Sequence, residues 1–189
     1  EPMAVDGNVT ALELIVIIQL IKHHNPCMVF EIGTFDGRTT LNMAANCAED
    51  AKVYTLDLPN EKRHGMKLPI EPCDALYINK ELISLRYTGT EYSKKITQLY
   101  GDSARFDFSA FVNQIDFVFV DGSHSHEYAL NDSLHALELL RDKRSVILWH
   151  DYDAWKGVTN ALNKLYVDSP EFKGLKHIEG TSLVCLLRD

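Results

Sequence analysis

Short apolar runs alternate with segments of helical periodicity along most of the chain, and this alternation restricts the fold more than any other feature. The run Met28–Ile32 is followed by Gly33 and then by helical spacing over Thr39–Cys47. An apolar run without a polar face is typical of a parallel strand that is buried on both sides. Repetition of such β-then-α units predicts an α/β protein with a doubly wound, mostly parallel Rossmann-like sheet and helices on both faces.

The same reasoning gives the remaining elements. We expect further strands at residues 52–58, 96–100, 115–120 and 145–149. We expect helices at residues 9–22, 127–141 and after Gly157, the second of these burying Leu130, Leu134, Leu137 and Leu140 on one face. Two short strands near 175–178 and 183–187 predict a C-terminal antiparallel hairpin. The 189 residues fit one domain, with an insertion or lid at about 59–91 that breaks the rhythm.

Charge and cysteine usage exclude several classes of protein. The net charge is −8, so the basic footprint that holds nucleic acid or an anionic membrane is lacking. The apolar stretch Leu12–Ile21 is too short to span a bilayer and lacks the flanks of a signal peptide. The four cysteines form no C-x-x-C pair, which favours reduced thiols and a cytoplasmic location. The helix at 9–22 packs either on its own sheet or on a neighbouring subunit, so a homo-oligomer stays open.

An acidic residue stands at the end of every predicted strand of the parallel sheet. In chain order they are Glu31, Asp57, Asp102, Asp121 and, after His150, Asp151. Ligands of such sheets bind beyond the carboxyl ends of the strands. A ring of carboxylates suits a ligand that carries donors and positive charge, or a metal ion, and suits a phosphate poorly.

The turn Gly33-x-x-x-Gly37 separates two cofactor classes. A nicotinamide-dinucleotide fingerprint needs G-x-G-x-x-G, but Phe35 occupies the middle glycine position and Asp36 would repel a pyrophosphate. No Walker A sequence occurs. Asp57 nevertheless lies where such folds place the acid that accepts from a ribose diol. A nicotinamide-dependent oxidoreductase is therefore disfavoured, whereas another nucleoside-containing cofactor fits.

The chain resembles a known family at these positions. The segments that carry the resemblance are VFEIGTFDGRTT, VYTLDLP, YGDSARFD, IDFVFVDGSHSHEYALND and VILWHDYDAWKGVTNAL. They are similar to class I S-adenosylmethionine (SAM)-dependent methyltransferases, and more narrowly to the small O-methyltransferases of catechols, macrolide sugars and the cephalosporin pathway. The resemblance covers the chain from about Val9 to its end, and the insertion matches least.

The resemblance implies a set of cofactor-binding residues. Glu31, Gly33 and Gly37 are expected to line the methionine part of SAM, with Thr34 and Thr39 nearby. Asp57 is expected to accept from the ribose hydroxyls. Asp102 and Ser103 would meet the adenine, and Asp121 the sulfonium.

The resemblance also implies catalytic and metal-binding residues. Asp121 and His124 match the catalytic positions, His124 as the base that takes the acceptor proton. Metal-dependent relatives bind Mg²⁺ with Asp121 and two acidic or amide residues at the end of the fifth strand, where this chain has His150 and Asp151. Imidazole is a poor partner for Mg²⁺. Three alternatives follow: a softer divalent cation binds, the two aspartates hold a cation with waters, or no metal binds and the histidines act as bases.

These observations predict a SAM-dependent methyltransferase that acts on a hydroxyl of a small metabolite. The alternative is a SAM- or nucleotide-binding module without transferase activity. His124 and His126 also have a plainer interpretation, as loop residues beside a helix capped by Ser125. Tyr128, Tyr152 and Trp155 either form a wall for the acceptor or simply pack. The acceptor itself stays open among sugars, phenols, polyketide hydroxyls and nitrogen compounds.

Overall fold

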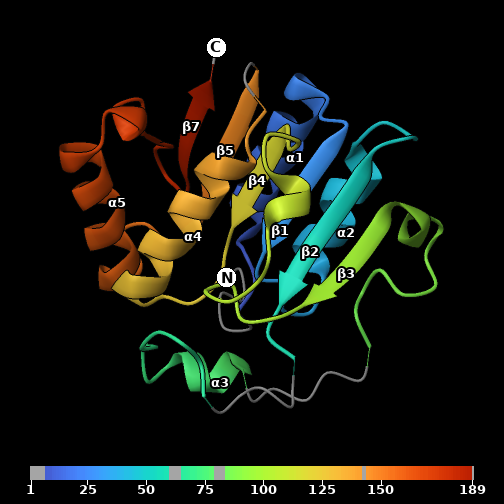
Figure 1. Cartoon of the computed structure of the whole chain (residues 1–189). Coiled ribbons are helices and arrows are strands. Elements are labelled where there is room, and N and C mark those ends of the chain that lie inside the picture. The colour runs from blue at the N-terminus through green and yellow to red at the C-terminus, as the bar shows by residue number, and fades with distance from the viewer. Residues whose placement is uncertain (1–6, 60–64, 79–83, 142–143, 189) are drawn as a thin grey trace.

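All strands of the described chain belong to a single sheet. The computed structural model describes residues 7–59, 65–78, 84–141 and 144–188, and its strand order is β3-β2-β1-β4-β5-β7-β6 (Figure 1). The strands are β1 (Met28–Ile32), β2 (Lys52–Asp57), β3 (Ile96–Tyr100), β4 (Phe117–Val120), β5 (Ser145–Trp149), β6 (Lys176–His177) and β7 (Val184–Arg188). β1 to β5 run parallel, and β7 is antiparallel to both β5 and β6. The predicted doubly wound sheet with a C-terminal hairpin is confirmed.

Helices cover both faces of this sheet (Figure 1). Helices α1 (Ala11–His24) and α2 (Arg38–Asn46) pack on one face, and α4 (His126–Leu139) and α5 (Lys156–Asp168) pack on the other. The short helix α3 (Asp74–Ile78) lies beyond the carboxyl ends of the parallel strands. Short 3₁₀ helices occur at η2 (Glu91–Lys95), η3 (Ser109–Phe111) and η4 (Pro170–Phe172). No helix in the described part of the chain has the length and apolar character needed to span a bilayer.

The buried strands explain why the sheet needs two helical layers. On β1, Val29 packs in the cluster that holds α1 and α2, whereas the next residue, Phe30, packs in the cluster that holds α4 and α5. On β4, Phe117 and Val118 are divided between the two clusters in the same way. The continuous apolar runs seen in the sequence are what a sheet covered on both faces requires.

The expected series of β-then-α units is incomplete. In the described residues, the connection from β2 to β3 contains only α3 and η2, and the connection from β3 to β4 contains only η3. The expected fourth strand also begins later, because Ile115 forms an isolated bridge with Leu140 before β4 starts. The segment after β2 has no apolar stripe of helical period, so nothing in it can pack a long helix onto the sheet.

The expected apolar face of α4 is confirmed except at one residue. Leu140 is buried, and Leu130 and Leu137 pack against the core, but Leu134 is exposed. The most deeply buried positions of the helix include Ala129, Ser133, Ala136 and Leu139. Small side chains on this face allow α4 to lie close to the sheet and to α5. The leucine spacing therefore marked one flank of the buried face rather than its centre, and the helix itself and its Ser125 cap are as predicted.

Gly33 permits the closest approach between two strand ends. Its φ is +99°, and a Cβ atom built there would lie 1.9 Å from the carbonyl oxygen of Asp121. Any other residue would therefore push the end of β1 away from the end of β4. Gly33 therefore allows close contact between the loops that follow β1 and β4, the two strands between which the strand order reverses.

We predict that Gly33→Ala destabilises the fold by about 3 kcal/mol or more, because backbone strain adds to a clash with backbone atoms. The matched control is Gly180→Ala, since Gly180 has a φ of +80° but open space around it, and it should cost only about 1 kcal/mol. Urea denaturation of both variants measures the two costs. Equal losses would show that the contact with Asp121 does not limit this position.

Candidate active site

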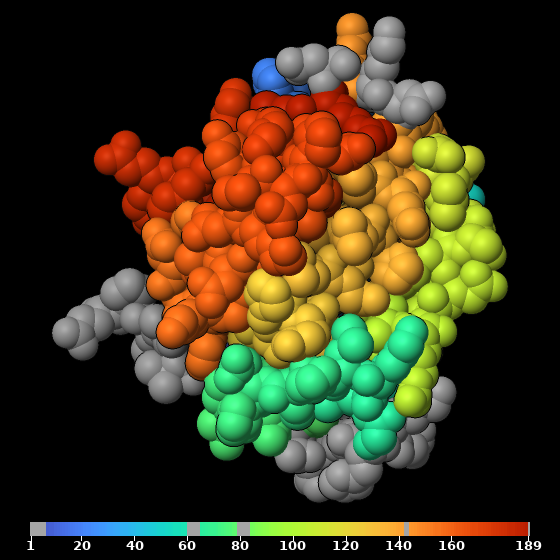
Figure 2. Space-filling view, turned by 60° about the vertical axis from the view of Figure 1, so that its left-hand side comes forward, coloured from blue at the N-terminus to red at the C-terminus, as the bar shows by residue number. Residues whose placement is uncertain are grey.

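The carboxyl ends of the parallel strands meet at one edge of the sheet, beside α3 (Figure 1), and the predicted acidic residues stand at these strand ends. A cavity of about 170 Å³ lies there, between the ends of β1, β2, β3 and β4 and the segment 65–78. Figure 2 shows this segment, in green, lying across the edge of the molecule and against the region of α4. No Lys or Arg occurs among the described residues that line the cavity, whereas five aspartates do: Asp57, Asp74, Asp102, Asp121 and Asp132. The cavity is therefore strongly electronegative.

The expected cofactor-binding residues divide into two groups. Gly33, Asp57, Asp102, Ser103 and Asp121 line the cavity. The others lie behind or beside its wall and do not line it; they are Glu31, Thr34, Gly37 and Thr39.

Glu31 is completely buried beneath the loop that follows β1. Thr40 and Thr55 donate hydrogen bonds to its Oε2 atom, while Oε1 has no partner among the described residues. Burial raises the pKa of Glu31 to about 8. Thr55 also bonds Thr34 over 2.6 Å, so Glu31 supports the floor of the site from below.

Asp57 and Asp102 differ in how far the protein already satisfies them. Burial raises the pKa of Asp57 to about 6, and one of its oxygens accepts from the amide of Leu58. Asp102 accepts from the amide of Lys67 and from the hydroxyl of Tyr128 over 2.9 and 2.8 Å. Asp102 thus ties the insertion and α4 to the end of β3.

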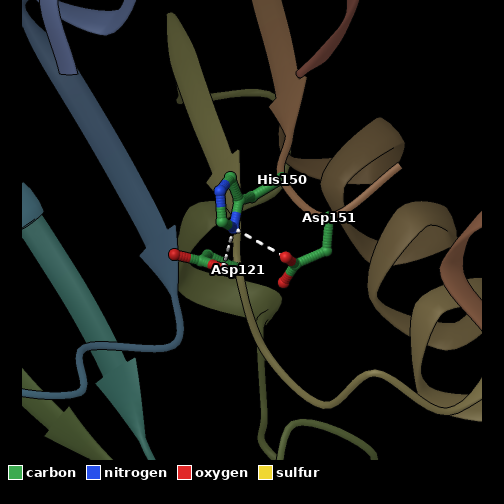
Figure 3. A group of neighbouring side chains, drawn as sticks. All are labelled: Asp121, His150 and Asp151. Carbon is green, nitrogen blue, oxygen red and sulfur yellow. Dashed lines mark hydrogen bonds and ion pairs between the residues drawn. The ribbon is translucent and has the colours of Figure 1, made fainter. Parts of the chain in front are cut away.

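Asp121, His150 and Asp151 form a compact group at the ends of β4 and β5. Figure 3 shows the three side chains pointing toward one another. The Nδ1 atom of His150 lies 3.0 Å from Asp121 Oδ1 and 3.2 Å from Asp151 Oδ1. One ligand atom from each residue lies within 4.8 Å of the others. Ligands about 2.0–2.2 Å from one cation lie about 3 Å apart, so the donor set fits a divalent cation as well as it fits shared protons.

Burial and charge act in opposite directions on the two histidines. Burial lowers the pKa of His150, but the charge of Asp121 and hydrogen bonds with acidic neighbours raise it far above its ordinary value. Burial likewise lowers the pKa of His124, but hydrogen bonds with Asp151 and Asp74 raise it to about 10. The same two rings hold the pKa of Asp151 below its usual range despite its burial.

His124 lies between two carboxylates. Its Nδ1 atom contacts Asp74 of α3, and its Nε2 atom lies 3.0 Å from Asp151 Oδ2. Asp74 also accepts from the hydroxyl of Ser123 over 2.6 Å and from the amide of His124. His124 can reach an acceptor hydroxyl through Nε2 only when Asp151 gives way.

Sequence reasoning missed three acidic residues of this region: Glu13, Asp74 and Asp132. Asp74 lies in the insertion, for which no motif was recognised. Glu13 lies three residues after Thr10, the spacing of a helix capping box, and this local role gives no indication of a second one. Asp132 is completely buried on α4, where Asn131 donates to it and burial raises its pKa to about 6. For Asp132, the signal of a role in the site is an acidic residue at a helix position that the structure shows to be buried.

The aromatic residues considered as an acceptor wall have different surroundings. Trp155 lies beside His124, with 4.4 Å between ring centroids, and Tyr77 of α3 approaches the same imidazole from 5.6 Å. Tyr152 instead contacts His177 of β6, and Tyr128 hydrogen bonds Asp102. Of the three expected residues, Trp155 is therefore the one in contact with the candidate base.

Comparisons with known proteins show the family and agree with the fold. The family model described as a methyltransferase domain matches residues 30–152, which run from β1 to just beyond β5. A comparison with curated proteins finds none that matches this sequence.

Solved structures share the fold at low sequence identity. The O-methyltransferase TomG from Streptomyces achromogenes, in complex with SAM, is 16% identical, with 98% of this chain and 83% of that chain covered and a TM-score of 0.64. An O-methyltransferase from Bacillus cereus in complex with SAH (S-adenosylhomocysteine) is 14% identical, with 97% and 83% covered and a TM-score of 0.63. SAH-bound methyltransferase PaMTH1 from Podospora anserina is 16% identical, with 97% and 80% covered and a TM-score of 0.64.

We predict that Glu31 makes stability fall as the pH rises. Its pKa rises from 4.5 to about 8 on folding, so the folded state binds more protons between these values. The free energy of unfolding should therefore lose up to about 1.4 kcal/mol per pH unit over that range, relative to Glu31→Gln. Urea denaturation of both proteins at several pH values measures the difference. Parallel pH profiles for the two would contradict the prediction.

Proposed function

Because the chain belongs to the methyltransferase-domain family, we propose that it transfers a methyl group from SAM to a hydroxyl group of a small metabolite. The observation that carries the proposal is the electronegative cavity at the carboxyl edge of the sheet, with no Lys or Arg among its described lining residues. A sulfonium and an ammonium group suit such a cavity, whereas the phosphates of a dinucleotide do not. The hydroxyl acceptor is suggested by the O-methyltransferases among its structural neighbours.

The residues around the cavity fit SAM in kind. Gly33 has no side chain, so a ligand in the cavity can approach its backbone closely. Asp57 offers acceptor oxygens to a ribose diol, and Asp121 offers a negative charge to the sulfonium. Asp102 and Ser103 lie at the end of β3 for the adenine, while Glu31, Thr34, Gly37 and Thr39 shape the loop from behind. The cavity is smaller than ligand pockets of ~300 Å³ and above. We expect Met66, Tyr77 and Ile78, which line the cavity, to shift outward when SAM binds.

Methyl transfer from SAM needs no covalent intermediate with the protein. SAM supplies a methyl group on a sulfonium, which is a good leaving group. The chain has to align the acceptor oxygen and remove its proton. We assign proton removal to Nε2 of His124, with Asp74 holding Nδ1 so that the ring keeps this orientation. Asp151 is shared by both histidines, and its contact keeps a proton on Nε2 of His124. A ligand that draws Asp151 away lowers the pKa of this ring, so that Nε2 can release its proton to solvent and then accept the proton of the acceptor hydroxyl.

A divalent cation fits the same site. Asp121, His150 and Asp151 would hold it, and it would lower the pKa of the acceptor hydroxyl and orient it. A ligand set with one imidazole favours a transition metal over Mg²⁺.

The wider setting follows from the same features. We propose that residues 1–189 act as one methyltransferase domain, with 59–91 as an insertion beside the acceptor. The four cysteines are free thiols, which supports a cytoplasmic location, and the acidic charge opposes nucleic-acid or membrane partners. Helix α1 packs on its own sheet through Ile17 and Ile21. Its exposed Leu12 and Ile15 leave room for a homo-oligomer.

The first test is calorimetric titration with SAH, for which we expect micromolar affinity and no binding of NADH. Asp57→Asn should weaken SAH binding about 10- to 100-fold, because a hydrogen bond to a charged group contributes about 1.5–3 kcal/mol. Asp168→Asn is the matched control, since Asp168 is exposed on α5 and pairs with Lys164. Failure to bind SAH, or a preference for NADH, would overturn the proposed function.

The second test concerns the base. His124→Ala should lower kcat by about 10²- to 10⁴-fold on any catechol, phenol or sugar that the unchanged protein methylates, with SAH affinity preserved. Transfer of labelled methyl groups measures kcat, and calorimetry measures affinity. His23→Ala, at the exposed end of α1, should change neither. Unaltered turnover in His124→Ala would remove this residue from catalysis.

A further inference from the structure

Glu13 makes contacts that exceed those of a helix cap. It lies in the first turn of α1, where the amide and hydroxyl of Thr10 donate to its Oε2 atom over 2.8 Å each. Such a capping box is a local arrangement within the first turn of a helix. Here the Glu13 side chain is only 5% exposed. Its other oxygen, Oε1, accepts from the amide and the hydroxyl of Ser182, over 2.8 and 2.7 Å.

The same carboxylate reaches the imidazole at the end of β5. Oε2 of Glu13 lies 3.3 Å from Nε2 of His150. Glu13 and His150 are 137 positions apart in the chain, and their contact is at the Nε2 side of the imidazole ring. The opposite side, Nδ1, faces Asp121 and Asp151. The ring is held at both nitrogens, and Glu13 is the partner that comes from α1 rather than from the end of β4 or β5.

We propose that Glu13 is a positioning residue that fixes the His150 ring, so that Nε2–H points to α1 and Nδ1 always faces Asp121 and Asp151. A carboxylate behind a ligating histidine selects the tautomer and orients the ring. Glu13 plays this part whether Nδ1 carries a proton or binds a divalent cation. The ring orientation follows from the contacts alone; its catalytic consequence rests on the proposed function.

Ser182 connects this contact to the hairpin. Its hydroxyl also lies 3.3 Å from the amide of Asp151. Glu13 and Ser182 therefore hold two neighbouring residues of the group, His150 by its ring and Asp151 by its backbone. Asp151 has a φ of +69°, a left-handed conformation that needs such support. The N-terminal helix and the C-terminal hairpin together form the back of the site.

The direct test is the ring of His150 in ¹⁵N-labelled, metal-free protein. A long-range ¹H–¹⁵N correlation spectrum, assigned with His150→Gln, reports which ring nitrogen carries a proton. We expect a protonated Nε2 in the unchanged protein. A ring protonated at Nδ1 alone would overturn the proposal, and this measurement needs no folded Glu13 variant.

Variants separate positioning from capping. Glu13→Gln cannot serve Thr10, Ser182 and His150 with a single acceptor oxygen, so the His150 signals should shift. Thr10→Ala weakens the same helix cap, which costs about 1 kcal/mol of stability, but it keeps the Glu13 carboxylate. The His150 signals should therefore not shift in this variant. Equal shifts in both variants, or no shift in Glu13→Gln, would show that Glu13 is only a cap.

Titration with Mn²⁺, followed by electron paramagnetic resonance, adds a second readout. Where the unchanged protein binds Mn²⁺, Glu13→Gln should weaken binding about 10- to 100-fold, and Thr10→Ala should not. Equal affinity in Glu13→Gln would contradict positioning toward a metal. SAH affinity should be unchanged in all variants, so a protein that binds no SAH but shows the expected ring signals refutes the proposed function and leaves this inference standing.

Discussion

The candidate site depends on one electrostatic constraint: largely buried carboxylates crowd together, and in the described part of the chain their ion-pair partners are two imidazole rings. The carboxylates belong to Glu13, Asp74, Asp121 and Asp151, and the rings to His124 and His150. A buried carboxylate without a partner costs several kcal/mol, so every member of this chain of contacts needs its neighbours. With all four acids ionised and both rings protonated, two negative charges remain. This excess is what makes the edge of the sheet suited to a sulfonium or to a divalent cation.

The fold concentrates this charge through backbone geometry rather than through side-chain packing. Parallel neighbours β4 and β5 deliver Asp121 and His150 to the same edge, and the absence of a side chain at Gly33 lets β1 approach the loop of Asp121. Gly157 does the same for α5, because a Cβ atom there would lie 2.2 Å from the carbonyl oxygen of His124. The two loops that carry the chemistry are therefore pinned by close backbone contacts, which leaves their side chains free to serve the site.

The sequence was most informative where one rule decides the outcome. A residue at the end of a buried parallel strand has to lie at the carboxyl edge, so Asp57, Asp121 and Asp151 could be placed without a structure. The rule says which edge a side chain reaches but not which way it points, and Glu31 accordingly turned out to lie beneath the loop rather than on the cavity wall. Asp74 could not be placed, because its position depends on how an irregular segment runs past the carboxyl ends of the strands, and no periodicity in the sequence specifies that path. Glu13 fitted a local capping pattern so well that its contact with a residue far along the chain left no trace in the sequence.

His150, at the end of β5, reduces the need for a cation to hold the acidic side chains of the site together. Three carboxylates within a few ångströms repel one another strongly and need a cation to remain together. An imidazole in place of one of them removes one negative charge, and its proton supplies a positive one. The group Asp121, His150 and Asp151 can therefore keep its geometry with a proton at Nδ1 of His150. In the proposed function a cation would take the place of that proton, and the contact between Glu13 and Nε2 of His150 would be common to both states.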